Sequence, residues 1–120
     1  MNRRMARLNG LFQEELADLL REIRDPRLAP IVSITCVDVA PDLESAVVHT
    51  SVLGDADEKR NSIEALNHAV PFLRRELLHR LRIRKIPALI FALDETIEEA
   101  ARVLELMRKV STAPPTEPSE

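Results

Sequence analysis

The sequence predicts a single α+β domain in which helices cover a three-stranded sheet. Apolar residues recur at helical spacing in three separate stretches, and β-branched residues cluster in two short runs between the first and second of them. A third apolar run follows the second helical stretch. At 120 residues the chain is long enough to bury one core. The predicted order is therefore helix, strand, strand, broken helix, strand, helix.

The first helix is predicted over residues 3–23. One stripe at intervals of three and four carries its apolar residues, which are Met5, Leu8, Phe12, Leu16, Leu19 and Ile23. The helix should end at Asp25-Pro26-Arg27, because Asp-Pro favours a turn.

Two strands are predicted next, over residues 31–39 and 45–53. In the first, Val32, Ile34 and Cys36 are expected on one face, with a bulge where the alternation slips at Cys36-Val37. Cys36 is expected to be a small buried hydrophobe. The connection over residues 40–44 is short, which favours an antiparallel hairpin.

A long amphipathic helix interrupted by proline is predicted over residues 62–85. Its apolar stripe is Ile63, Leu66, Val70, Leu73, Leu77 and Leu81. Pro71 lacks the N–H that a continuous helix would need and its ring crowds the preceding turn. The helix must therefore kink or split at Ala69-Val70-Pro71.

The last elements are a strand over residues 88–94 and a helix that begins at Thr96. The strand is almost continuously apolar, which predicts cover on both faces and parallel pairing after the helical crossover. The final helix is expected to place Ile97, Ala101, Leu104 and Met107 against the core. Residues 1–110 are thus predicted to form the domain, and residues 111–120 a disordered, acidic, proline-rich tail.

Cationic residues gather in two segments, although the net charge of the chain is −3. A cationic face can attract a polyanion even on a near-neutral protein. A solvated helix face and a frayed helix start are the alternatives for the two segments. The candidate RNA-binding residues are Arg3, Arg4, Arg7, Arg74, Arg75, His79, Arg80, Arg82, Arg84 and Lys85.

The kink itself is a second candidate contact. Val70 has no side-chain acceptor to cap the following helix, so the N–H groups of Phe72 and Leu73 are expected to lack partners. Free N–H groups at a helix start favour an anion. The alternative is architectural, since proline is common at the first position of a helix.

Other classes of function find little support in the composition. No metal, nucleophile or phosphate-loop motif occurs, so we expect neither an enzyme nor a cofactor nor a metal site. Only three aromatic residues are present, which disfavours an aromatic base-stacking platform. The lone cysteine and the absence of an apolar signal or spanning run favour a cytoplasmic protein without a membrane partner, and we expect a monomer.

Taken in order, the motifs resemble the ribosome-binding factor A family of bacteria over about residues 2–108. Each piece is weak alone, but the order and spacing are specific. The matching pieces are the helix with Arg3, Arg4 and Arg7, Asp25-Pro26-Arg27, residues 31–39, Pro41-Asp42-Leu43, residues 51–55, residues 65–69, Phe72-Leu73-Arg74, residues 81–84, residues 86–89, Phe91, Asp94, Thr96, Ile97 and Glu98.

The resemblance implies a type II KH-like fold in which an alanine-centred kink replaces the usual GxxG loop. Ala69 would be the alanine of that kink, and Pro71 departs from the small residue usual nearby. The resemblance further implies a factor that binds the 30S ribosomal subunit and 16S rRNA and assists late maturation and rRNA processing. The alternative hypothesis is a protein-binding module whose basic helix docks an acidic partner.

Overall fold

Four helices and three strands make up the chain in the computed structural model, which describes residues 3–111. The order is α1 (Arg3–Leu20), β1 (Val32–Val39), β2 (Ser45–Val52), α2 (Ala56–His68), α3 (Val70–Leu81), β3 (Ala88–Leu93) and α4 (Thr96–Ser111). The α+β prediction and the predicted element order are confirmed. The predicted tail lies outside the described residues, apart from Ser111.

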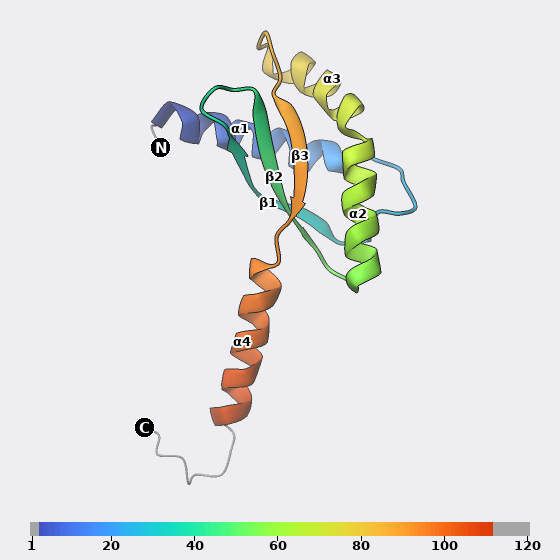
Figure 1. Ribbon diagram of the computed structural model, residues 1–120, viewed down its shortest axis with the longest axis vertical. Coiled ribbons are helices and arrows are strands. Elements are labelled where there is room, and N and C mark those ends of the chain that lie inside the picture. The colour runs from blue at the N-terminus through green and yellow to red at the C-terminus, as the bar shows by residue number, and fades with distance from the viewer. Residues whose placement is uncertain (1–2, 112–120) are drawn as a thin grey trace.

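The three strands form one mixed sheet in the order β1-β2-β3. β1 and β2 pair antiparallel as a hairpin, and β3 joins β2 in parallel after the crossover through α2 and α3. Both pairings are as predicted. α1, α2 and α3 lie on one side of this sheet (Figure 1).

The core lies between the sheet and these helices. α1 buries Phe12, Leu16 and Leu19 completely, which confirms the predicted stripe within this helix. The helix ends at Leu20, three residues before the predicted end, so Ile23 packs against the core from the turn that follows. The sheet contributes alternate residues of each strand, among them Val48 and Phe91. No helix within residues 3–111 has both the length and the apolar character needed to cross a membrane.

Polar side chains of the helices complete the two edges of the sheet. On the β1 edge, Asn9 accepts a hydrogen bond from the Val39 N–H at 2.9 Å, and Gln13 donates to the Thr35 carbonyl at 3.2 Å. On the β3 edge, Asn67 accepts from the Phe91 N–H at 3.1 Å. Edge strands expose unpaired backbone groups, so these bonds both fix the helices and protect the edges.

Three expectations about the sheet are wrong. The register shifts between Ile34 and Cys36, one step before the predicted bulge, so Cys36 lies exposed on the face opposite Ile34. β3 is covered on one face only, since Leu89 and Phe91 are buried whereas Ile90 is 49% exposed. The apolar run of β3 therefore does not indicate two-sided burial.

α2 begins at Ala56, six residues before the predicted start. Asp55 caps it, and its carboxylate accepts a hydrogen bond from the Glu58 N–H at 2.8 Å. The Glu58 carboxylate accepts in turn from the Asp55 N–H at 2.9 Å, which completes a capping box. The residues Asp55 and Glu58 at this spacing are a sequence signal that could have placed the helix start.

The predicted break divides α2 from α3 at Ala69, whose φ of −84° and ψ of −1° form a single joint between them. Ala69 donates to the Ala65 and Leu66 carbonyls at 3.1 Å. Pro71 lies in the first turn of α3, where an N–H would have no helical partner in any case. The proline thus starts a helix rather than straining the middle of one.

α4 does not pack against the core, contrary to prediction. It leaves the end of β3 and extends away from the body (Figure 1). Leu104 is 61% exposed and Met107 is 60% exposed, and Ala101 is exposed as well. The side chain of Ile97 lies outside the described residues.

Asp94 connects this helix to the sheet. Its carboxylate accepts hydrogen bonds from the Thr35 hydroxyl at 2.6 Å and from the Thr96 N–H at 2.9 Å. These bonds, the one from Thr35 first, lower the pKa of Asp94 to about 2. Asp94 is therefore ionised at neutral pH, and it positions the first turn of α4.

Pro71→Ala should destabilise the fold slightly, by about 0.4–1 kcal/mol, because alanine leaves the unfolded chain freer while the first turn of α3 loses no hydrogen bond. Chemical denaturation of the two proteins measures the difference. Pro30→Ala, in an exposed loop, is the matched control and should show a loss of similar size. A gain of about 3 kcal/mol for Pro71→Ala would instead mean that the proline strains a continuous helix.

Candidate nucleic-acid interface

The chain between α3 and β3 turns sharply at its first residue. Arg82 closes α3 with a φ of 53° and a ψ of 41°, which is the left-handed conformation. Beyond it Ile83 packs against the core and Ile86 is buried, while the side chains of Arg84 and Lys85 are exposed. The local fold therefore presents three successive cations around one apolar anchor.

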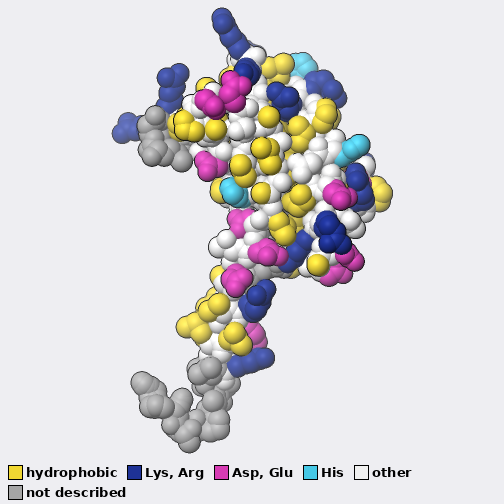
Figure 2. All heavy atoms as spheres, viewed as in Figure 1, with side chains coloured by type: hydrophobic (Ala, Val, Ile, Leu, Met, Phe, Trp, Pro, Cys, Tyr) yellow, Lys and Arg dark blue, Asp and Glu magenta, His cyan; other side chains and the backbone are white. Residues whose placement is uncertain are grey.

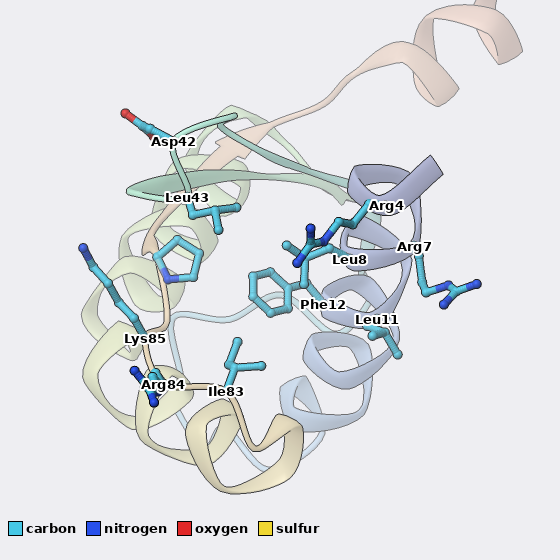
Figure 3. Close-up of a pocket in the computed structure, with 11 residues that line it drawn as sticks. Arg4, Arg7, Leu8, Leu11, Phe12, Asp42, Leu43, Ile83, Arg84 and Lys85 are labelled. Carbon is cyan, nitrogen blue, oxygen red and sulfur yellow. The ribbon is translucent and has the colours of Figure 1, made fainter. Parts of the chain in front are cut away.

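Ile83, Arg84 and Lys85 of this segment, with Pro87, form one wall of a hollow of about 610 Å³. α1 forms the facing wall, and the β1–β2 turn closes the upper side (Figure 3). The lining residues are Arg4, Arg7, Leu8, Leu11, Phe12, Asp42, Leu43, Ile83, Arg84, Lys85 and Pro87. The two basic segments of the sequence thus meet across an apolar floor.

The surrounding surface is cationic. In Figure 2, Lys and Arg side chains project from the start of α1 and from the end of α3, with a small acidic group between them. Both ends lie on the part of the body that is remote from α4 (Figure 1). A protein of net charge −3 therefore carries a localised positive end, which orients it toward polyanions.

The predicted cations fall into two groups. The side chains of the first group are exposed and have no ion pair among the described residues; this group is Arg3, Arg4, Arg7, Arg75, His79, Arg82 and Arg84. Members of the second group hold the fold together. Arg74 donates to the Ile86 carbonyl at 2.7 Å, and Lys85 lies 2.9 Å from both carboxylate oxygens of Glu44.

Arg80 has the most extensive contacts of this second group. Its guanidinium lies 2.7 Å from Asp18 and 3.1 Å from Glu15, both on α1, and 3.2 Å from Glu22 in the turn just after that helix. The hydrogen bond from Arg80 lowers the pKa of Asp18, and the same contacts raise the pKa of Arg80. Arg80 therefore ties α3 to α1, and its guanidinium is less available to a polyanion than the exposed arginines are.

The kink lies apart from the hollow. Ala69 and Val70 are partly buried against the core, whereas Pro71 is exposed. A shallow depression beside Ala69 is lined by Glu22 and Asp25 among other residues. The Leu73 N–H donates to the Ala69 carbonyl at 3.0 Å, so the expectation that it lacks a partner is wrong.

The sequence did not indicate that the apolar residues of the hollow would come together in one site. Leu8, Leu43, Ile83 and Pro87 come from three distant segments, and each has an ordinary apolar position in its own segment. Leu43 differs from the others in its backbone conformation, since its φ of 63° places a bulky residue in the left-handed region of a turn. That conformation becomes visible only in the folded chain.

The fold and this surface define a small KH-like α+β domain with a cationic end. The element order, the mixed sheet and the helix–joint–helix crossover are those predicted for that class. No glycine lies between α2 and α3, where a GxxG loop would be, because the only glycines are Gly10 and Gly54. Within the described residues, no group of three His, Cys, Asp or Glu side chains could hold a metal ion.

The chain belongs to the ribosome-binding factor A family, whose family model matches residues 4–107. Ribosome-binding factor A of Lachnoclostridium phytofermentans is 42% identical over 106 residues, covering 88% of this chain and 78% of that protein. The Acetivibrio thermocellus protein of the same name is 39% identical over 109 residues, covering 90% and 89%. The resemblance stated from the sequence is confirmed.

Comparison with known structures shows the same fold. The crystal structure of ribosome-binding factor A from Thermus thermophilus has a TM-score of 0.68 at 25% identity, covering 74% of this chain and 93% of that one. A Thermotoga maritima protein solved by NMR has a TM-score of 0.71 at 35% identity, covering 82% and 95%. A homology model of the Thermus factor, fitted into a cryo-EM map of a 30S complex, has a TM-score of 0.62 at 23% identity, covering 72% and 90%.

Arg80→Met should lower the thermal stability at neutral pH, because the carboxylates of Glu15, Asp18 and Glu22 lose their common partner. Arg80 holds the pKa of Asp18 below its ordinary value of 3.8. The stabilisation is therefore complete above about pH 4 and is lost as the pH falls through the folded-state pKa of Asp18. The gap between the melting temperatures of wild type and variant should close in acid.

Arg75→Met is the matched control, since it removes the same charge from the same helix at an exposed position without an ion pair in the described chain. Its melting temperature should match that of wild type at neutral pH. Equal losses for the two variants would contradict the structural role of Arg80.

Proposed function

We propose that this protein is a ribosome assembly factor that binds the free 30S subunit through 16S rRNA. Its task would be to assist late maturation of the subunit and processing of that rRNA. The observation that carries the proposal is the hollow that brings Arg4 and Arg7 together with Arg84, supported by membership of a family described as ribosome-binding factor A. A relative fitted into a map of a 30S complex adds further support.

The mechanism follows from electrostatics and shape. Guanidinium groups without acidic partners would bind phosphates of the rRNA, and each such contact releases counterions. The shape of the folded rRNA would supply most of the selectivity. Occupying the immature subunit would favour one arrangement of rRNA, after which the factor would leave. This role is binding rather than catalysis. The protein would carry it out in the cytoplasm.

The exposed cations of α3 are central to this mechanism. Arg75 lies in α3, and Arg82 ends that helix. Neither has an ion pair within residues 3–111, so neither must break a contact before it binds phosphate. Arg74, Arg80 and Lys85 are held by the Ile86 carbonyl, the α1 carboxylates and Glu44 respectively, and would contribute less.

The double variant Arg75→Glu/Arg82→Glu should bind small subunits more weakly and with a shallower dependence on salt. Losing two phosphate contacts should reduce the slope of log affinity against log salt by about 1.4–1.8. Binding titrations over a series of salt concentrations measure both quantities. Unchanged affinity together with an unchanged slope would refute the assignment.

The control variant is Arg102→Glu/Arg108→Glu, which changes the net charge equally on α4, away from the body. It should retain most of the affinity of wild type. If it weakens binding as much as the α3 variant, net charge rather than the cationic end governs the interaction.

A protein-binding module remains the second candidate, because a basic surface can also dock an acidic protein. RNase treatment of a pulldown separates the two. Loss of the partner on digestion supports the RNA-binding function, and retention of a protein partner after complete digestion supports the alternative.

A further inference from the structure

The hollow beside the cationic residues combines two features that solvated basic surfaces lack. Its floor is apolar, with the fully buried Phe12 at the bottom and with Leu8, Leu43 and Ile83 around it. Its volume of about 610 Å³ lies within the range of roughly 300–1,000 Å³ typical of ligand pockets. Phosphate contacts alone need no such floor, because phosphates bind at the solvated surface.

We propose that this hollow holds one unpaired nucleobase extruded from the RNA, while Arg4 and Arg84 bind the phosphates on either side of it. This inference rests on the proposed RNA-binding function and assigns a distinct site within it. The faces of a nucleobase are apolar, and its neighbouring phosphates are anionic. An apolar cavity between two cationic rims matches that distribution of chemistry.

The side chains are placed for this role. In Figure 3, Leu43 and Ile83 point toward the hollow from opposite sides, and the ring of Phe12 lies between them. The Arg4 guanidinium also lies over the hollow in this view. From this position it can bind a phosphate next to a base that occupies the hollow, since a guanidinium binds phosphate oxygens through two parallel N–H groups.

The charges around the rim favour a nucleotide over a protein side chain. Arg4 and Arg7 on one wall and Arg84 on the other have no ion pair among the described residues, while Lys85 contacts Glu44. An apolar protein side chain has neutral amides beside it, whereas a base has a phosphate on each side. Cations on two opposite walls therefore fit the nucleotide.

Among the residues that the structure describes, Asp42 is the one acidic residue that lines the hollow. Its Oδ1 accepts a hydrogen bond from the Glu44 N–H at 2.9 Å, and its carboxylate points away from the hollow in Figure 3. It therefore serves the turn and leaves the cavity apolar. With mainly apolar side chains facing the base, the site should accept purines and pyrimidines alike.

Leu43→Gly tests the site with little risk to the fold. It removes an apolar wall, leaves every charge in place, and suits the φ of 63° at this position better than leucine does. Leu78→Ala, exposed on α3 and outside the hollow, is the matched control. The ligands are an RNA hairpin with a single bulged 2-aminopurine and the same hairpin with an abasic bulge.

The full-length wild type and Leu78→Ala should bind the 2-aminopurine hairpin about fivefold or more tightly than the abasic one, within the range of base-stacking effects. Their binding should also change the 2-aminopurine fluorescence. Leu43→Gly should bind both hairpins equally and at an unchanged salt slope. Arg84→Ala should instead reduce the slope by about 0.7–0.9.

Two results would overturn the site while leaving the proposed function standing. One is salt-dependent binding of both hairpins with equal affinity by wild type. The other is a Leu43→Gly variant that loses affinity for small subunits yet keeps the preference for the base, which would indicate that a protein side chain fills the hollow. Absence of salt-dependent binding to either hairpin and to small subunits would refute both proposals.

Discussion

The break at Ala69 is the constraint on which the rest of the structure depends. Leu66 in α2 and Leu77 in α3 are both fully buried, but α2 packs against β3 whereas α3 packs against α1. One straight helix could not satisfy both contacts, so the joint with Pro71 just beyond it redirects the chain. The end of α3 then lies beside α1, and the cationic segment that follows reaches the arginines at the chain's beginning. The apolar hollow exists only because of this change of direction.

The cations of this surface have two roles, and the contacts of each side chain decide which role it has. Arg80 contacts two carboxylates of α1 and that of Glu22 just beyond it, and so fixes the crossing of α1 and α3, while Arg74 holds the Ile86 carbonyl. These anchored groups position the others without being free to bind phosphate themselves. The exposed arginines can then interact with a polyanion at little cost in reorganisation, which is the advantage of a preorganised site. A cluster that looks uniform along the chain thus has two physical roles.

α4 shows the limit of amphipathicity as a guide. Its apolar side chains recur at helical spacing, and the helix forms as that spacing predicts. The periodicity states that one face of a helix is apolar but not which surface covers it. Here Asp94 fixes the exit from β3 through Thr35 and Thr96, and the helix leaves the body with Leu104 and Met107 exposed.

Local chemistry by itself determined the element types, the hairpin and the break at Ala69, because spacing, β-branching and proline act within a few residues of the chain. The same reasoning named the cationic residues, since charge is a property of composition. The family was indicated separately, by the resemblance of its motifs in order along the sequence. Only the tertiary structure decided that Arg80 is anchored while Arg82 has no ion pair within residues 3–111, that one face of β3 is open, and that Leu8, Leu43 and Ile83 share a hollow. Those outcomes depend on which distant segments meet, and no local pattern encodes the path that brings them together.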